Sequence, residues 1–102
     1  MPNDTTFCAI YHWRLDESKL DQFREGWRVV TELYLDQANS RGSRLHRCED
    51  GTWLAYAQWP SRDAWEAAGA GGYESPGFKQ MAEAVLERFE TRLLHVDTDL
   101  LA

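Results

Sequence analysis

Cysteine, proline and long apolar runs are all scarce in this sequence, and each scarcity narrows the kind of protein it encodes. Only two cysteines and three prolines occur among 102 residues, which excludes a disulfide scaffold and a proline-rich linker. We expect Cys8 and Cys48 to be reduced, buried thiols of a soluble, cytoplasmic protein. No apolar stretch is long enough to span a bilayer, and the N-terminus lacks the basic and apolar segments of a signal peptide.

Positive charge is also in short supply. The chain has 11 Lys and Arg against 17 Asp and Glu, a net charge of −6 at pH 7. Nucleic-acid phosphates and anionic lipid headgroups are not attracted to such a surface, so we expect neither a nucleic-acid nor a membrane partner. The three histidines do not have the spacing of metal ligands, and we predict no metal site.

Aromatic residues, by contrast, are abundant. They make up 13% of the chain, with five tryptophans, and hydrophobic residues make up 43%. This length and composition are typical of one globular domain over residues 1–102. Rings of this size are buried in a core, packed in an interface or used in a binding site, and the functional question is which of these applies.

The hydrophobic pattern predicts an alternation of strands and helices. The expected elements are a strand over 7–14, a helix from 18 to about 38, a hairpin over 44–59, a short helix from 61 to about 68, a helix from 75 to about 90, and a strand over 91–97. Ser18 and Asp21 fit a capping box, Ser61 is a good N-cap, and Ser75 precedes a proline at the first helical position.

The hairpin is the central element of the prediction. Asp50-Gly51 favours a two-residue turn in which His46 pairs with Ala55. Side chains alternate along a strand, so this register assigns one face to Arg44, His46, Cys48, Trp53, Ala55, Ala57 and Trp59 and the other to Leu45, Arg47, Thr52, Leu54, Tyr56 and Gln58. Neither face is entirely polar, so both need to be covered.

The predicted order fits an α+β fold: a ferredoxin-like, four-stranded antiparallel sheet with helices on one face. Helices cover only one side of such a sheet. Leu45, Leu54 and Tyr56 would then form an apolar patch on the other side, and an apolar face in water is an association site. We expect a homodimer through this open face, because a two-fold interface is self-complementary.

Three segments of the chain resemble a known family. Residues 44–47 (RLHR), 50–53 (DGTW) and 57–61 (AQWPS), with Trp65 after them, are similar to the antibiotic biosynthesis monooxygenase family. The resemblance covers nearly the whole chain and implies two ferredoxin-like units packed sheet to sheet as an α+β barrel dimer. The family includes cofactor-free oxygenases of aromatic polyketides, haem-degrading enzymes and quinol oxygenases, so the reaction does not follow from the fold.

The resemblance suggests one site residue, and the predicted hairpin face suggests others. Trp59 matches the family's pocket tryptophan, and the small side chains of Ala55 and Ala57 would leave room beside it; the alternative is that Trp59 only fills the core. His46 could accept a proton from a phenol or quinol, and Arg44 could hold a carboxylate or enolate. For both residues, an ordinary position at the edge of the sheet is the alternative.

Further aromatic residues complete the predicted pocket. Tyr11, Trp13 and Trp53 would line it, and Tyr73 would be the tip of a lid formed by the glycine-rich segment 69–72, unless that segment is only a connector. The predicted function is a cofactor-independent monooxygenase of a small electron-rich aromatic such as a phenol, hydroquinone or polyketide. The alternative is a non-catalytic small-molecule-binding protein or a structural dimer.

Haem degradation is disfavoured by two positions. The haem-degrading members carry an Asn where this chain has Trp13, and an axial His that would fall within residues 69–72, which contain no histidine. Without that ligand the iron has no proximal donor. We therefore predict no cofactor.

Overall fold

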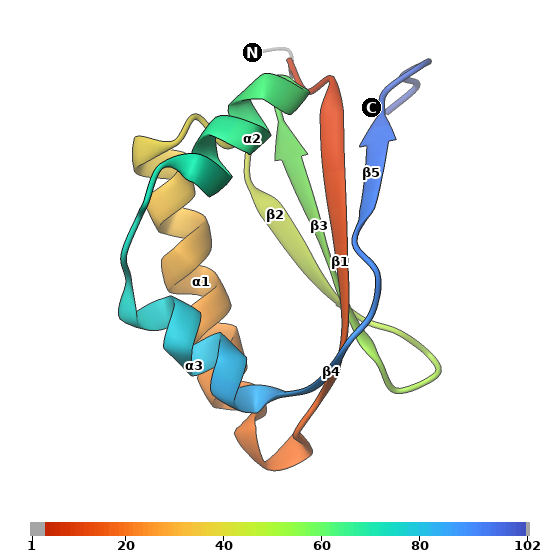
Figure 1. Cartoon of the computed structure of the whole chain (residues 1–102). Coiled ribbons are helices and arrows are strands. Elements are labelled where there is room, and N and C mark those ends of the chain that lie inside the picture. Colours follow the sequence, from red (N-terminus) through yellow and green to blue (C-terminus); the bar gives the residue numbers. More distant parts are fainter. Residues whose placement is uncertain (1–3, 102) are drawn as a thin grey trace.

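The computed structural model describes residues 4–101 and shows a single antiparallel sheet with helices on one face (Figure 1). The strands are β1 (Phe7–Leu15), β2 (Ser43–Arg47), β3 (Trp53–Trp59), β4 (Val85–Arg88) and β5 (Arg92–His95). A 3-10 turn (Glu17–Lys19) precedes α1 (Leu20–Gln37), and α2 (Arg62–Ala70) and α3 (Pro76–Ala84) follow β3. The strand order is β2-β3-β1-β4, with β5 also paired to β1. The predicted α+β class is confirmed.

The strand beside β1 is divided into two pieces. β4 pairs with Trp13 to Leu15 at one end of β1, and β5 pairs with Phe7 to Ile10 at the other end. The predicted helix to residue 90 is wrong, because α3 ends at Ala84 and Val85 is extended (φ −86°, ψ 121°). The end of β1 offers hydrogen-bonding partners there: the Asp16 N–H donates to the Ala84 carbonyl at 2.8 Å. Strand pairing thus ends a helix that the apolar spacing alone would continue.

Two of the three predicted helix caps are confirmed. The Ser61 hydroxyl accepts a hydrogen bond from the Ala64 N–H, and the Ser75 hydroxyl accepts one from the Gly77 N–H. The capping box at Ser18 is wrong. Asp16 instead caps the 3-10 turn by accepting from the Ser18 N–H at 3.0 Å, and α1 begins at Leu20 without a side-chain cap.

The hairpin register differs by one residue from the prediction. Leu45 pairs with Ala55, and His46 pairs with Leu54. The cause is a three-residue loop: the Cys48 N–H bonds the Thr52 carbonyl, and Gly51 adopts φ +89°. Such a loop, with Gly in the left-handed region, is the other common hairpin connection. A shift of one residue exchanges the two faces of β2.

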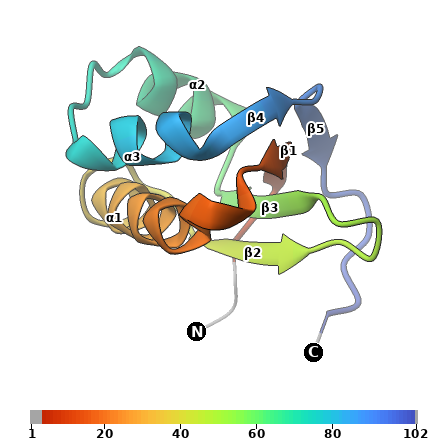
Figure 2. The same ribbon diagram turned by 90° about the horizontal axis from the view of Figure 1, so that it is seen from below.

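Helices α1 and α3 pack closely side by side on the sheet (Figure 2). Gly26 of α1 and Gly77 of α3 are both buried at the crossing. A Cβ built on Gly26 would lie 2.7 Å from the Gly77 carbonyl oxygen, and one on Gly77 would lie 2.7 Å from the Gly26 oxygen. The two glycines therefore allow a backbone approach that no larger residue permits.

The core lies between the sheet and the helices, in two clusters. One contains Trp13, Leu15, Phe23, Trp53, Ala55 and Ala84, and the other contains Phe7, Ala57, Trp59 and Ala68. Cys8 is buried and free, whereas Cys48 is free but half-buried, so the prediction of two buried thiols is right only for Cys8. Within residues 4–101, no helix has both the length and the apolar character required to cross a membrane.

Candidate functional site

A cavity of about 360 Å³ separates the helices from the sheet. Its wall is formed by Tyr11, Trp13, Trp27, Val30, Thr31, Tyr34, Ser40, Ser43, Ala55, Ala57, Trp59, Phe78, Met81, Ala82, Val85 and Arg88. The volume is in the range of small-molecule sites, and the wall is mostly aromatic and aliphatic with few polar groups, as such sites are.

The space exists because the floor of the cavity is made of small side chains. Ala55 lies opposite Tyr11 in the sheet, and Ala57 lies opposite Ala9. The roof comes from α1 and α3, which contribute Trp27, Val30, Tyr34, Phe78 and Met81 to the wall. Two alanines beneath two helices leave a volume that larger residues in β3 would occupy.

Five of the residues predicted for the site lie together in the cavity wall, namely Tyr11, Trp13, Ala55, Ala57 and Trp59. Trp59 is only 3% exposed, and its ring centroid lies 5.9 Å from that of Tyr34. Its indole N–H is buried without a hydrogen-bond partner in the described part of the chain, as is that of Trp27. Buried polar groups are normally paired, so two unpaired donors beside a cavity favour a ligand that accepts hydrogen bonds.

His46 and Arg44 do not lie in the cavity, and their predicted placement is wrong. Because of the three-residue loop, His46 pairs with Leu54 and Arg44 with Tyr56. Both side chains therefore lie on the open face of the sheet, away from the helices, and both residues are exposed. An imidazole on the opposite side of the sheet cannot take a proton from a ligand in this cavity.

Trp53 and Tyr73 also lie outside the cavity wall. Trp53 is buried in the core, with the guanidinium of Arg24 at 5.4 Å and that of Arg47 at 5.2 Å from its ring centre. The Tyr73 hydroxyl donates to the Gln37 carbonyl at 2.9 Å. This hydrogen bond joins the residue after the glycine-rich segment 69–72 to the C-terminal end of α1.

The wall residues that were not predicted as site residues include Trp27, Tyr34 and Arg88. The apolar stripe of the first helix contains Trp27 and Tyr34, but spacing alone does not distinguish a cavity wall from a core. Arg88 fell within the predicted helix. In the structure it lies in β4 opposite Trp13, and it is the one charged residue in the cavity wall.

The phenols in the wall stay protonated at neutral pH. Burial raises the pKa of Tyr11, while the hydrogen bond from Trp65 and the charge of Arg88 oppose that rise. Burial also raises the pKa of Tyr34. Both hydroxyls are therefore potential hydrogen-bond donors toward the cavity.

The cavity wall includes no histidine, aspartate or glutamate. Across residues 4–101, no group of three or more His, Cys, Asp or Glu side chains is arranged to hold a metal ion. Proton removal inside the cavity therefore has no side-chain base among the wall residues. What the wall offers is a dry aromatic volume, hydrogen-bond donors and one cation.

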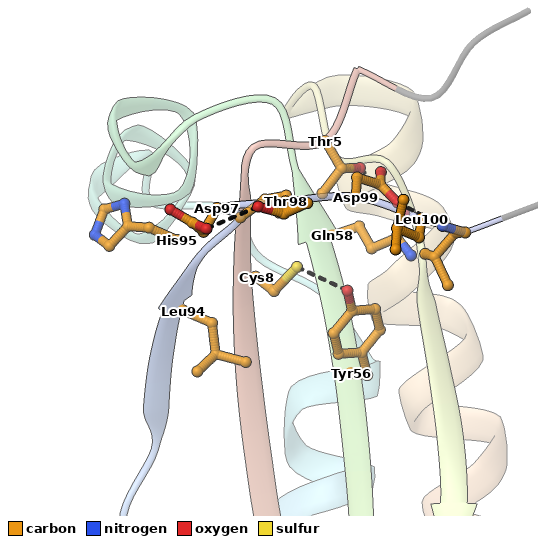
Figure 3. A pocket seen from close by; sticks show the side chains of 12 residues that line it. Thr5, Cys8, Tyr56, Gln58, Leu94, His95, Asp97, Thr98, Asp99 and Leu100 are labelled. Atoms are coloured by element: carbon orange, nitrogen blue, oxygen red, sulfur yellow. Dashed lines mark hydrogen bonds between the residues drawn. The ribbon is translucent and has the colours of Figure 1, made fainter.

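A second cavity, of about 420 Å³, lies between the open face of the sheet and the C-terminal segment 94–101 (Figure 3). The Cys8 thiol donates to the Tyr56 hydroxyl at 2.9 Å in its floor. This bond and burial raise the pKa of Tyr56 to about 12. Although this space is larger, its far wall is a stretch of exposed chain, so we regard the aromatic cavity under the helices as the candidate site.

The fold has clear structural relatives. No known protein family and no curated protein sequence matches this chain. The cofactor-independent oxygenase SnoaB from Streptomyces nogalater superposes with a TM-score of 0.77 at 15% identity, over 94% of this chain and 97% of that one. A monooxygenase from ActVA-Orf6 of Streptomyces coelicolor, solved with nanaomycin D, has a TM-score of 0.70 at 15% identity, over 97% and 94%.

Rv0793 from Mycobacterium tuberculosis superposes with a TM-score of 0.74 at 12% identity, over 95% of this chain and all of that one. At such identities the likeness concerns the fold and not the reaction. This chain therefore has the ferredoxin-like α+β fold that these structures share.

Proposed function

We propose that this protein is a cofactor-independent monooxygenase of a small, electron-rich aromatic compound. The observation that carries the proposal is the aromatic cavity of about 360 Å³ between the sheet and the helices. Proteins of the same fold include a cofactor-independent oxygenase and a monooxygenase solved with the ligand nanaomycin D, which supports the proposal.

In the proposed reaction the substrate itself supplies the electrons. The substrate is a phenol or hydroquinone whose keto tautomer, as in anthrone, has a CH₂ group in the ring. Loss of a proton from either tautomer gives the same anion, which passes one electron to dioxygen. The resulting radical and superoxide combine at that carbon to a hydroperoxide, which loses water to leave a carbonyl. The net change is R₂CH₂ + O₂ → R₂C=O + H₂O, and it requires no external reductant.

The cavity would promote this reaction mainly by electrostatics and exclusion of water. Because its wall includes no His, Asp or Glu, the proton would leave to solvent at the mouth, where Arg88 is exposed. Donors and a cation that stabilise the anion lower the free energy of ionisation. The protein's part is then to favour the ionised substrate in a dry site.

A second candidate is a non-catalytic binding protein for the same class of ligand. The absence of a side-chain base from the cavity wall favours this reading. Oxygen consumption separates the two candidates. The purified protein is incubated with anthrone and with 1,4-naphthohydroquinone in air, with buffer alone and the Ala57→Leu variant as controls.

Substrate-dependent oxygen uptake above the buffer rate, lost in Ala57→Leu, supports the monooxygenase. Oxygen uptake equal to buffer, together with a ligand-induced rise in melting temperature, supports the binding protein. If neither compound shifts the melting temperature nor consumes oxygen, both candidates are wrong.

We also propose that two chains associate through the open faces of their sheets. The helices cover only one face (Figure 1), and Ile10, Leu54 and Tyr56 are half-buried on the other face. Leu45, predicted for this interface, instead lies on the helix-covered face and packs against the core. The proposed interface therefore rests on β1 and β3.

A further inference from the structure

The hydroxyl of Tyr11 has a defined hydrogen-bond direction. The indole Nε1–H of Trp65 donates to the Tyr11 oxygen at 2.9 Å. An indole N–H is only a donor, so the Tyr11 oxygen is the acceptor in this bond and its own hydrogen points elsewhere. No residue among 4–101 accepts that hydrogen. Trp65, from α2, is not itself part of the cavity wall.

Arg88 lies in the same wall as Tyr11. It is opposite Trp13 in the sheet, and Trp13 and Tyr11 share one face of β1, with ring centroids 6.1 Å apart. The guanidinium of Arg88 forms no ion pair in the described chain. The neighbouring carboxylate, that of Glu87, is paired with Arg14 at 3.0 Å. The charge of Arg88 therefore remains available to a ligand at the mouth of the cavity.

We propose that Tyr11 and Arg88 form an oxyanion-binding subsite, and that Trp65 is a positioning residue that keeps the Tyr11 hydroxyl pointing into the cavity as a donor. The inference builds on the proposed function by assigning the part of the cavity that holds the ligand's charged oxygen. The ligand class is an aromatic phenolate or enolate. A hydroxyl that already accepts a hydrogen bond is polarised and becomes a better donor.

One other titratable group lies in the wall. Besides Tyr11 and Arg88, the wall contains only Tyr34 as a titratable side chain. Tyr34 packs against Tyr73 and Phe78 at centroid distances of 5.8 and 6.1 Å. The raised pKa of Tyr11 keeps it in the protonated, donating form at neutral pH.

The test uses 4-nitro-1-naphthol, whose anion is coloured, bound to the full-length protein under argon. The absorbance of the bound probe is titrated with pH in the wild type and in Tyr11→Phe, Arg88→Gln and Trp65→Phe. Burial of the probe raises its pKa equally in all of them, so the differences between variants report the subsite. Tyr73→Phe removes a hydroxyl outside the cavity and is the matched control.

We expect Tyr11→Phe and Arg88→Gln each to raise the pKa of the bound probe by about one, which is a tenfold loss of selectivity for the anion. The rise in the probe's pKa caused by Arg88→Gln should be smaller at high salt, because Arg88 is exposed and its charge is screened. Trp65→Phe should raise the probe's pKa less than Tyr11→Phe does. In the Tyr11→Phe background it should add nothing, because Trp65 acts through Tyr11.

A probe pKa that Tyr11→Phe leaves unchanged would overturn the subsite, as would a failure of the wild type to bind the probe. An effect of Trp65→Phe that persists in the Tyr11→Phe background would overturn the positioning role. None of these measurements requires turnover. If oxygen uptake fails but the predicted pKa pattern holds, the monooxygenase is wrong and the oxyanion subsite stands.

Discussion

His46 lies opposite Leu54 in the sheet, one position away from the partner that a two-residue Asp-Gly turn would have assigned to it. This shift of one residue in the strand register places the imidazole on the face of the sheet opposite the aromatic cavity. The base predicted from the hairpin register is therefore absent from the cavity, whose wall contains no imidazole.

Replacing His46 by Ala should leave ligand affinity and any oxygen uptake within about twofold of the wild type, because the sheet separates it from the cavity. Tyr11→Phe, which removes a hydroxyl in the wall, is the comparison and should weaken binding of a phenolic ligand. Fluorescence titration and an oxygen electrode measure both. A loss of turnover in His46→Ala alone would show that the reacting site is on the open face.

Ala57→Leu should abolish binding of an aromatic ligand while the protein stays folded. Ala57 is 8% exposed and lies in the floor of the cavity, so the added carbons would fill the volume that a ligand needs. We expect at least a tenfold loss of affinity by tryptophan quenching. Ala67→Leu adds the same atoms at an exposed position of α2 and should bind normally.

The thermal stability of Ala57→Leu is informative in itself. Overpacking a filled core costs about 1–3 kcal/mol, whereas filling a real cavity costs little. A variant that loses binding without losing stability indicates a ligand cavity, and one that melts much earlier indicates a packed core. Unchanged binding would place the ligand elsewhere.

Gly26→Ala should destabilise the protein by about 1–3 kcal/mol, because its Cβ would lie 2.7 Å from the Gly77 carbonyl oxygen and push α1 away from α3. Gly69→Ala is the matched control. Apart from the neighbouring residues and backbone of α2 itself, no atom of residues 4–101 lies within 4 Å of a Cβ built there, and the change should be neutral or stabilising by up to about 1 kcal/mol. Urea unfolding followed by circular dichroism measures both. Equal stabilities would contradict the close helix crossing.

Light scattering should give a mass near twice the 11.8 kDa of one chain at micromolar concentration. Leu54→Asp should yield monomers or unfold, because a carboxylate would be buried unpaired in an apolar interface. Leu35→Asp changes an exposed leucine on α1, away from the open face, and should remain dimeric. A monomeric wild type would refute the proposed association.

Local sequence signals correctly determined several elements of the fold. Ser61 and Ser75-Pro76 start their helices at the predicted positions, since a cap depends on a side chain and backbone groups two or three residues away. The hydrophobic pattern predicted the first helix because the spacing of its apolar residues, Phe23 and Trp27 among them, is also a local property. From these elements the one-sided α+β sheet follows.

Tertiary structure decided the rest. Phe78, Met81 and Val85 continue a helical spacing, yet Val85 is extended because the distant β1 supplies its hydrogen-bonding partners. That pairing carries Arg88 into the cavity wall. No local pattern pointed to Arg88, because its partner strand β1 is far away in the sequence. The bond between Trp65 and Tyr11 was missed for the same reason, since these residues are 54 positions apart.

In the hairpin, local sequence determined one property and tertiary packing determined another. Asp50-Gly51 by itself determined that the chain turns there, because both residues readily occupy turn conformations. It did not determine whether the loop has two or three residues, since Gly51 suits either geometry. Packing decides the choice: in the observed register Leu45 packs against the core, while Arg44 and His46 stay exposed. The other register would bury Arg44 and His46 and expose Leu45. The free-energy difference between these two outcomes is larger than the preference of Asp-Gly for one loop length.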